Sequence, residues 1–221
     1  MITLAIDAST YAGDVALLDE SRVIAEENIA MKGADRERLM PAVVAVLQRS
    51  GLRVVDIGRV VCGGGPGSFT SLRIAGGIAK GISSGRGCPL YAAPSMALLV
   101  GGASVRAGRY LAAIDALRGE FYIGLYDVLV DARVSELEPA RLVAAVDVEN
   151  VAAELGAKIV SPSPFDSSVV ATPRARGVAA IEDLLESRGP VDIGSWEPSY
   201  GRLAEAQVRW EAAHGKPLSA G

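Results

Sequence analysis

The chain has 221 residues, of which 50% are hydrophobic and 22% are charged, and this composition excludes an intrinsically disordered protein because it can fill a core. The formal net charge is −4 at pH 7, so the chain lacks the basic surplus with which autonomous nucleic-acid-binding proteins hold a phosphate backbone. We therefore expect it not to bind RNA tightly by itself.

The predicted elements begin with an apolar strand at residues 2–7, and no basic leader segment precedes it. No run of about eighteen apolar residues occurs in the sequence, so neither a membrane span nor a membrane partner is expected. We expect a cytoplasmic protein. Cys62 and Cys88 lack the paired spacing of metal or redox sites, and we interpret them as small buried hydrophobic residues.

Hydrophobic periodicity in the first half predicts three strands, a helix, a strand and a second helix, at residues 2–7, 15–18, 23–29, 35–50, 59–62 and 70–84. The first helix is expected to end at Gly51, a residue typical of helix C-termini. Pro41 is expected to bend this helix because proline removes a backbone donor and crowds the preceding turn.

The second half is predicted to repeat this order, with elements at residues 110–115, 121–127, 133–137, 148–155, 158–160 and 178–186. Residues 161–176 are rich in serine and proline and predict an irregular surface connection, and residues 202–213 predict a polar helical tail. A degenerate duplication of this kind predicts an α/β fold of the actin-like (ASKHA, ribonuclease H-like) type, βββαβα twice, with a reduced second half. The predicted lobes are residues 1–101 and 102–221; an ordinary doubly wound α/β domain is the alternative.

The single histidine, His214, lies in the tail. Zinc proteases of the His-Glu-x-x-His type need two histidines on one helix face, and Ser-His-Asp catalysis needs one histidine held beside the nucleophile. We therefore predict no metal site and no catalytic residue in this chain.

Two small-residue turns are candidates for binding phosphate, because glycine lets backbone N–H groups converge on an anion before a helix N-terminus. The loop at residues 63–70 lacks the Lys-Ser/Thr pair that follows the last glycine of a Walker loop. In the turn at residues 7–10, serine stands where active actin-like proteins have the glycine of Asp-x-Gly-Thr. A purely structural turn is the alternative in both places. The candidate cofactor-binding residues are Asp7, Ser9, Thr10, Gly65, Gly67 and Ser68.

The helix at residues 70–84 is apolar on every side, and Gly77, Gly81 and Gly85 recur along one ridge. Each interior glycine costs about 1 kcal/mol relative to alanine, so close packing against another backbone is expected to compensate. Met40 and Val44 also widen the apolar face of the first helix. We predict a protein interface here, with a thick core as the alternative; its residues are Leu39, Met40, Val43, Leu72, Arg73, Gly77, Ile78 and Gly81.

The motif GPGSFTSLRI at residues 65–74, continuing as AKG at 79–81, closely resembles the signature of the TsaB (YeaZ-type) family, which is paralogous to TsaD. Three further stretches fit the same family: ITLAID at 2–7, AIDALRGEFY at 113–122, and PSYGR at 198–202 with Trp210. Residues 128–195 show little resemblance, and Asp35 stands where family members often carry histidine.

The resemblance implies an actin-like fold, a homodimer of the isolated chain and a heterodimer with TsaD through the first two helices, which TsaE joins. It implies a non-catalytic partner subunit needed to make N6-threonylcarbamoyladenosine at position 37 of tRNA (t6A37), with tRNA bound only within the complex. No cofactor is expected to bind tightly to this subunit alone, whereas ATP or ADP is possible in the complex. Two enzyme functions are the alternatives: a glycoprotease-like peptidase, or a small-molecule kinase or ATPase using Asp7, the 63–70 loop and Asp115.

Overall fold

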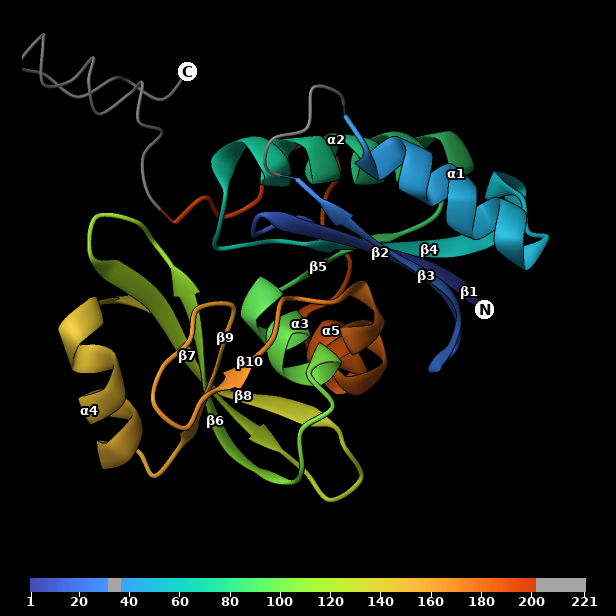
Figure 1. Ribbon diagram of the computed structural model, residues 1–221. Helices are drawn as coiled ribbons and strands as arrows, with labels where there is room; N and C mark the ends of the chain where they lie inside the picture. The colour runs from blue at the N-terminus through green and yellow to red at the C-terminus, as the bar shows by residue number, and fades with distance from the viewer. Residues whose placement is uncertain (32–36, 202–221) are drawn as a thin grey trace, which may run out of the picture.

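The structure is a computed structural model that describes residues 1–31 and 37–201 (Figure 1). The strands are β1 (Ile2–Asp7), β2 (Ala12–Asp19), β3 (Arg22–Ala30), β4 (Ile57–Gly63), β5 (Leu90–Ala93), β6 (Gly108–Asp115), β7 (Glu120–Val128), β8 (Val134–Ala144), β9 (Lys158–Ser161) and β10 (Val169–Val170). The helices are α1 (Leu39–Ser50), α2 (Phe69–Arg86), α3 (Ser95–Gly102), α4 (Val148–Glu154) and α5 (Glu182–Arg188), with 3₁₀ turns at Val54–Asp56, Ala145–Asp147 and Ala175–Ala180, the last called η3. The predictions for Asp35, Trp210, His214 and the tail at 202–213 lie outside the described residues.

The two halves of the chain form two five-stranded sheets of the same topology. The first sheet has the order β3-β2-β1-β4-β5, and the second, taken from its third strand, has the corresponding order β8-β7-β6-β9-β10. In each sheet the first three strands pair antiparallel, and the fourth and fifth extend the sheet in parallel. The predicted duplicated βββαβα fold is therefore confirmed. The second half is reduced, because a loop connects β9 to β10 where the first half has α2 between β4 and β5.

Helices separate and cover the two sheets in layers (Figure 1). One apolar cluster joins α1 and α2 to the outer face of the first sheet, and another joins α4 to the outer face of the second. A third cluster fills the space between the sheets, where α3, η3 and α5 pack against strands of both. The lobes therefore share a continuous core. None of the described helices is long and apolar enough to cross a membrane.

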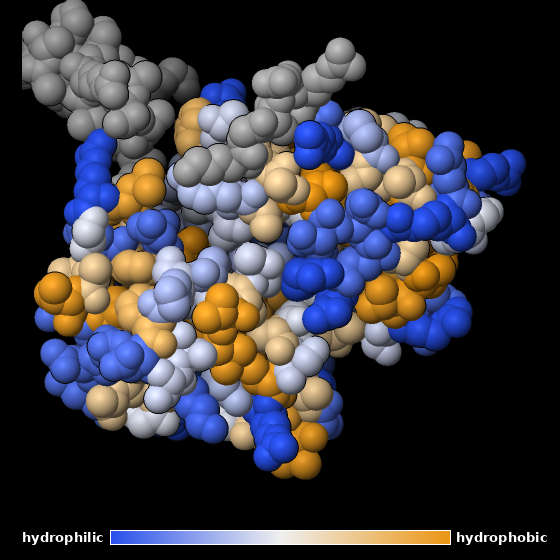
Figure 2. Space-filling model, in the orientation of Figure 1, coloured by the Kyte–Doolittle hydropathy of each residue, from blue (hydrophilic) through white to orange (hydrophobic). Residues whose placement is uncertain are grey.

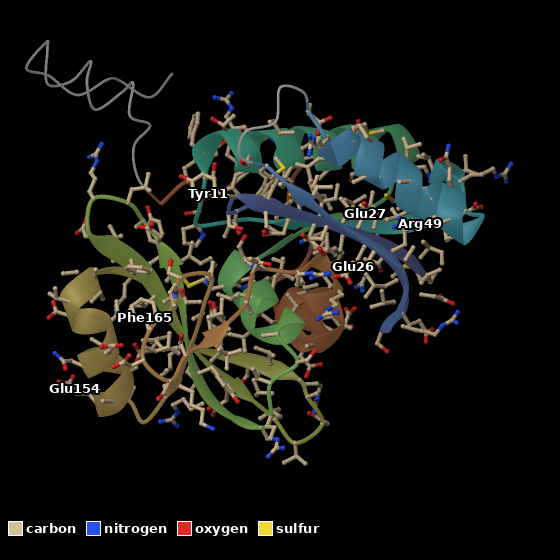
Figure 3. The ribbon with its side chains drawn as sticks, in the orientation of Figure 1. Tyr11, Glu26, Glu27, Arg49, Glu154 and Phe165 are labelled. Carbon is tan, nitrogen blue, oxygen red and sulfur yellow. The ribbon has the colours of Figure 1, made fainter. Side chains whose placement is uncertain are left out.

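Local sequence signals explain α1, with one correction. Gly51 ends the helix in the left-handed conformation at φ 69°, as predicted. The sequence predicted a bend at Pro41 because proline cannot donate a helical hydrogen bond. No such bond is lost here, because Pro41 lies in the first turn of α1 and the first intrahelical bond runs from the Ala42 N–H to the Arg38 carbonyl. At the other end, Arg49 donates to Glu27 at 2.5 Å and ties α1 to β3 (Figure 3).

The sequence analysis missed β5 and α3 and misplaced the last helix. In α3 every residue from Ser95 to Val100 is buried, so its sequence has no alternation between apolar and polar faces. The helix predicted at 178–186 is divided into η3 and α5 at Ile181. The division into lobes at residues 1–101 and 102–221 stays a prediction. Two segments of the second lobe, η3 and residues 191–201, return to pack on the first sheet and on α2 of the first lobe.

Candidate functional site

The turn after β1 places the Asp7 carboxylate inside the protein, with no exposed surface. Its Oδ1 atom accepts hydrogen bonds from the Ser9 backbone at 3.0 Å and the Ser9 hydroxyl at 2.8 Å, and the Ser95 hydroxyl donates to Oδ2 at 2.6 Å. Burial raises the pKa of Asp7, and these three hydrogen bonds oppose that shift. The carboxylate is thus engaged by its own chain. Thr10 likewise bonds locally, its hydroxyl donating to the Ala12 carbonyl at 3.2 Å.

The glycine-rich loop between β4 and α2 is closed by similar internal bonds. The Gly64 N–H donates to the Ala93 carbonyl at 2.7 Å, the Gly65 N–H to the Ser95 hydroxyl at 3.1 Å, and the Ser68 N–H to the Ser9 carbonyl at 2.7 Å. A phosphate cradle needs such N–H groups to be free and convergent. The structure brings the two predicted turns together: the Ser68 N–H joins them directly, and the N–H groups of Gly64 and Gly65 bond to Ala93 and Ser95.

Gly67 shows how closely these turns pack. A Cβ atom at this position would overlap the backbone of Ser9, so only glycine permits the approach. Ser95, which bridges Asp7 and Gly65, was missed by the sequence analysis because it lies 88 residues from Asp7 and carries no motif of its own.

A C-terminal segment, residues 191–201, crosses the loop and is called the strap below. It starts beside β5, where the Val191 N–H donates to the Leu90 carbonyl at 2.8 Å. Over the loop, the Ser199 N–H donates to the Gly64 carbonyl at 2.7 Å, and a Cβ atom on Gly65 would overlap the Ser199 carbonyl. The strap therefore covers the site at which a phosphate-binding loop would be open.

A hollow of about 320 Å³ remains between the loop, the strap and the second sheet. Arg188 and Glu136 line it and form an ion pair with each other, and the Tyr126 hydroxyl donates to Glu136 at 3.2 Å. Burial and the neighbouring Glu136 raise the pKa of Tyr126, so its hydroxyl keeps its proton. The positive charge of Arg188 and the negative charge of Glu136 therefore balance each other inside the hollow.

A second buried charge cluster fastens the C-terminal half to the first sheet, and the sequence analysis did not identify it. Asp14 on β2 has no exposed surface and receives a hydrogen bond from the Ala175 N–H at 2.7 Å. Arg174 lies 2.9 Å from Asp14 and 2.9 Å from Glu26, which Figure 3 labels on β3. Burial, and then repulsion from Glu26, raise the pKa of Asp14 to about 7.

The outer side of α2 is open along its glycine ridge. Apart from the helix's own backbone, no heavy atom of the described residues lies within 4 Å of a Cβ atom built at Gly77, Gly81 or Gly85. Ile74 and Ile78 border the ridge and are half-buried. Orange and pale residues lie between blue ones over the α1 and α2 layer in Figure 2. The glycines thus expose helix backbone that the described part of the chain does not cover.

On α1, Met40 and Val44 extend this open surface, with 38% and 42% of their surface exposed. At about 100° per residue they lie on the side of α1 opposite Arg49, which reaches β3, so they lie on the side of α2. We call the surface formed by the outer residues of both helices the α1–α2 face: Met40, Val44, Ile74, Gly77, Ile78, Gly81 and Gly85.

Several predicted interface residues need correction. Leu39, Val43 and Leu72 are 0% exposed, so their side chains belong to the core of this chain and not to a surface. They lie on the inward sides of α1 and α2, and apolar residues on other sides of both helices hid from the sequence which side faces the core. Arg73 is exposed at the edge of the face, and Ile74 was missed although it lies four residues before Ile78.

The fold and site define a class of protein: a duplicated actin-like α/β protein with closed cleft loops and an open helix face. A family model described as TsaD, tRNA N6-adenosine threonylcarbamoyltransferase, matches residues 29–170. The tRNA threonylcarbamoyladenosine biosynthesis protein TsaB of Bacillus subtilis is 30% identical over 95% of this chain and 98% of its own length. TsaB of Escherichia coli is 38% identical over 57% of this chain and 55% of its own length.

Solved structures agree with these relatives. The structure of YeaZ from Pseudomonas aeruginosa is 25% identical, with a TM-score of 0.71 over 89% of this chain and 98% of that one. A second structure, of an uncharacterized protein with similarity to the peptidase YeaZ from the same species, is 27% identical with a TM-score of 0.73 over 91% and 99%. The chain belongs to the TsaB (YeaZ) family.

Proposed function

We propose that this chain is a non-catalytic partner subunit for a TsaD-type threonylcarbamoyltransferase in the formation of t6A37 in tRNA. The observation that carries the proposal is the open glycine ridge of α2, on a chain that matches the full length of a Bacillus subtilis relative named for this biosynthesis. The α1–α2 face is the surface through which it binds TsaD.

The energetics of α2 support an interface. Glycine in a helix interior costs about 1 kcal/mol relative to alanine, and no contact from residues 1–31 or 37–201 compensates at Gly77, Gly81 or Gly85. A second helix could approach the bare backbone at these positions closely enough to gain dispersion contacts that side chains would prevent. Ile74 and Ile78 would lose their remaining exposure in the same contact.

The proposal includes three partners of this chain. TsaD binds this face in the complex, a second copy of this chain covers it in a homodimer, and TsaE joins the heterodimer. We propose that tRNA and ATP or ADP act only within the complex, in the cytoplasm, and that this subunit holds no cofactor tightly by itself.

The closed loops favour a non-catalytic role for this chain over a catalytic one. Asp7 is saturated by three donors, and the N–H groups of Gly64, Gly65 and Ser68 are all bonded internally. For a peptidase, Ser68 would be the nucleophile, but its hydroxyl bonds to Ser71 at 3.1 Å and the described residues contain no histidine to activate it.

Co-purification with TsaD of the same organism tests the proposal. Gly77→Leu places four carbons on the ridge, where the isolated chain has free space, and should abolish the complex while leaving the fold intact. Ala153→Leu, which places the same leucine side chain at an exposed position of α4 and adds three carbons, is the matched control and should leave the complex unchanged. Binding of TsaD at wild-type strength by the Gly77→Leu chain would contradict the proposal.

A further inference from the structure

The strap is packed on α2 directly beside the glycine ridge. The ring of Tyr200 packs at a tilt of 51° against Phe69 with centroids 4.5 Å apart, and the ring of Pro198 lies 3.2 Å from a Cβ atom built at Gly76. At about 100° per residue, Phe69 and Gly76 share one side of α2, and Gly77 and Gly81 share the next. The strap thus forms one wall of the α1–α2 face.

Both cations in the first three turns of α2 border the ridge and contact the strap or its aromatic neighbour. Arg73 lies four residues before Gly77, and Lys80 lies three residues after it, so both are neighbours of Gly77 on the helix surface. The Arg73 guanidinium lies over Phe69, 5.4 Å from the ring centroid. The Lys80 ammonium lies 3.6 Å from the Glu197 carboxylate and 5.8 Å from the centroid of the Trp196 ring.

This arrangement matters when a second backbone approaches the ridge. A cation left free beside Gly77 would lose water on association without gaining a partner, and such desolvation opposes binding. Glu197 and Trp196 of the strap contact Lys80, and Phe69, against which Tyr200 packs, contacts Arg73, so both cations have partners on the strap side of the ridge.

We infer that the strap prepares the α1–α2 face for its partner by holding Arg73 and Lys80 away from the glycine ridge. This inference rests on the proposed function and assigns residues 191–201 a role in controlling association. The Tyr200 hydroxyl donates to Glu197 at 2.8 Å, and this bond, followed by the nearby cations, lowers the pKa of Glu197. The carboxylate therefore stays charged at neutral pH.

The affinity of the full chain for TsaD, measured by calorimetry, tests the inference with a double-mutant cycle. Glu197→Gln removes the partner of Lys80 and should weaken binding about fivefold to tenfold, within the usual range of coupling between sites. Lys80→Met alone should bind within about twofold of wild type, because it removes the cation itself. The double variant should recover the affinity that Glu197→Gln loses.

Glu186→Gln removes an exposed carboxylate from α5 and is the matched control, with wild-type affinity expected. Glu197 is 64% exposed, so its substitution should leave the melting temperature unchanged. Wild-type affinity of Glu197→Gln, or failure of Lys80→Met to restore binding in that background, would overturn the inference while the proposed function stood. Failure of the wild-type chain to bind TsaD would overturn both.

Discussion

At the scale of single residues, the two turns that resemble phosphate-binding loops use their polar groups to hold the fold together. Ser9 replaces the glycine of the related turn, and its N–H and hydroxyl both donate to Asp7. Position 67 requires glycine for a different reason: the backbone of Ser9 leaves no space for a Cβ atom at Gly67. The sequence could show that both turns depart from nucleotide-binding patterns, but not that they bond to each other through Ser95.

Asp7→Asn should destabilise the protein by about 1–3 kcal/mol, because an amide offers one acceptor oxygen to three donors and leaves a buried group unpaired. Urea unfolding of the isolated chain measures this free energy. Asp115→Asn is the control: Asp115 is exposed and accepts one bond, from the Leu117 N–H, which an amide oxygen can also accept. Unchanged stability of Asp7→Asn would contradict the scaffold role.

At the scale of elements, α2 has three sides with different neighbours. Leu72, Ala75 and Ala79 pack into the core, Gly76 contacts the strap, and Gly77 and Gly81 face open space. Composition predicted that this helix is covered on more than one side. It could not tell which sides its own chain covers, because the strap lies more than a hundred residues away in sequence and no periodicity links it to α2.

Gly81→Ala should raise the free energy of unfolding by about 0.5–1 kcal/mol, since alanine restricts the unfolded chain and its methyl group clashes with none of the residues that the structure describes. The same variant should weaken binding to TsaD, because the added methyl group separates the two backbones. Thermal unfolding and calorimetry measure the two effects. A more stable variant with undiminished affinity would show that this glycine does not serve close approach.

At the scale of the whole molecule, the order of predicted elements sufficed to predict a duplicated fold. The missing information concerned β5, a strand of only four residues at the edge of the first sheet, and α3, which is too completely buried to give a period and lies in the layer between the sheets. That layer joins the lobes through a continuous apolar core and through the contact of Asp14 with Arg174 and Ala175.

The Asp14 cluster predicts a pH dependence of stability. The pKa of Asp14 is raised from 3.8 to about 7, so between these values the folded state holds a proton that the unfolded state releases. The stability that Asp14 contributes is therefore full below its unfolded pKa and is lost as pH rises through about 7. The difference in unfolding free energy between wild type and Asp14→Asn should fall from pH 4 to pH 7 and then level off. Parallel pH profiles of the two proteins would contradict this assignment.

Formation of t6A37 in a purified reaction tests the central claim most directly. The reaction contains TsaD and TsaE of the same organism, the threonylcarbamoyl donor, ATP and unmodified tRNA, with or without this chain. We expect modified tRNA when wild-type chain or Asp7→Asn is added, and none with Gly77→Leu or without the chain. Equal modification in the absence of this chain, or activity that survives Gly77→Leu and disappears with Asp7→Asn, would contradict it.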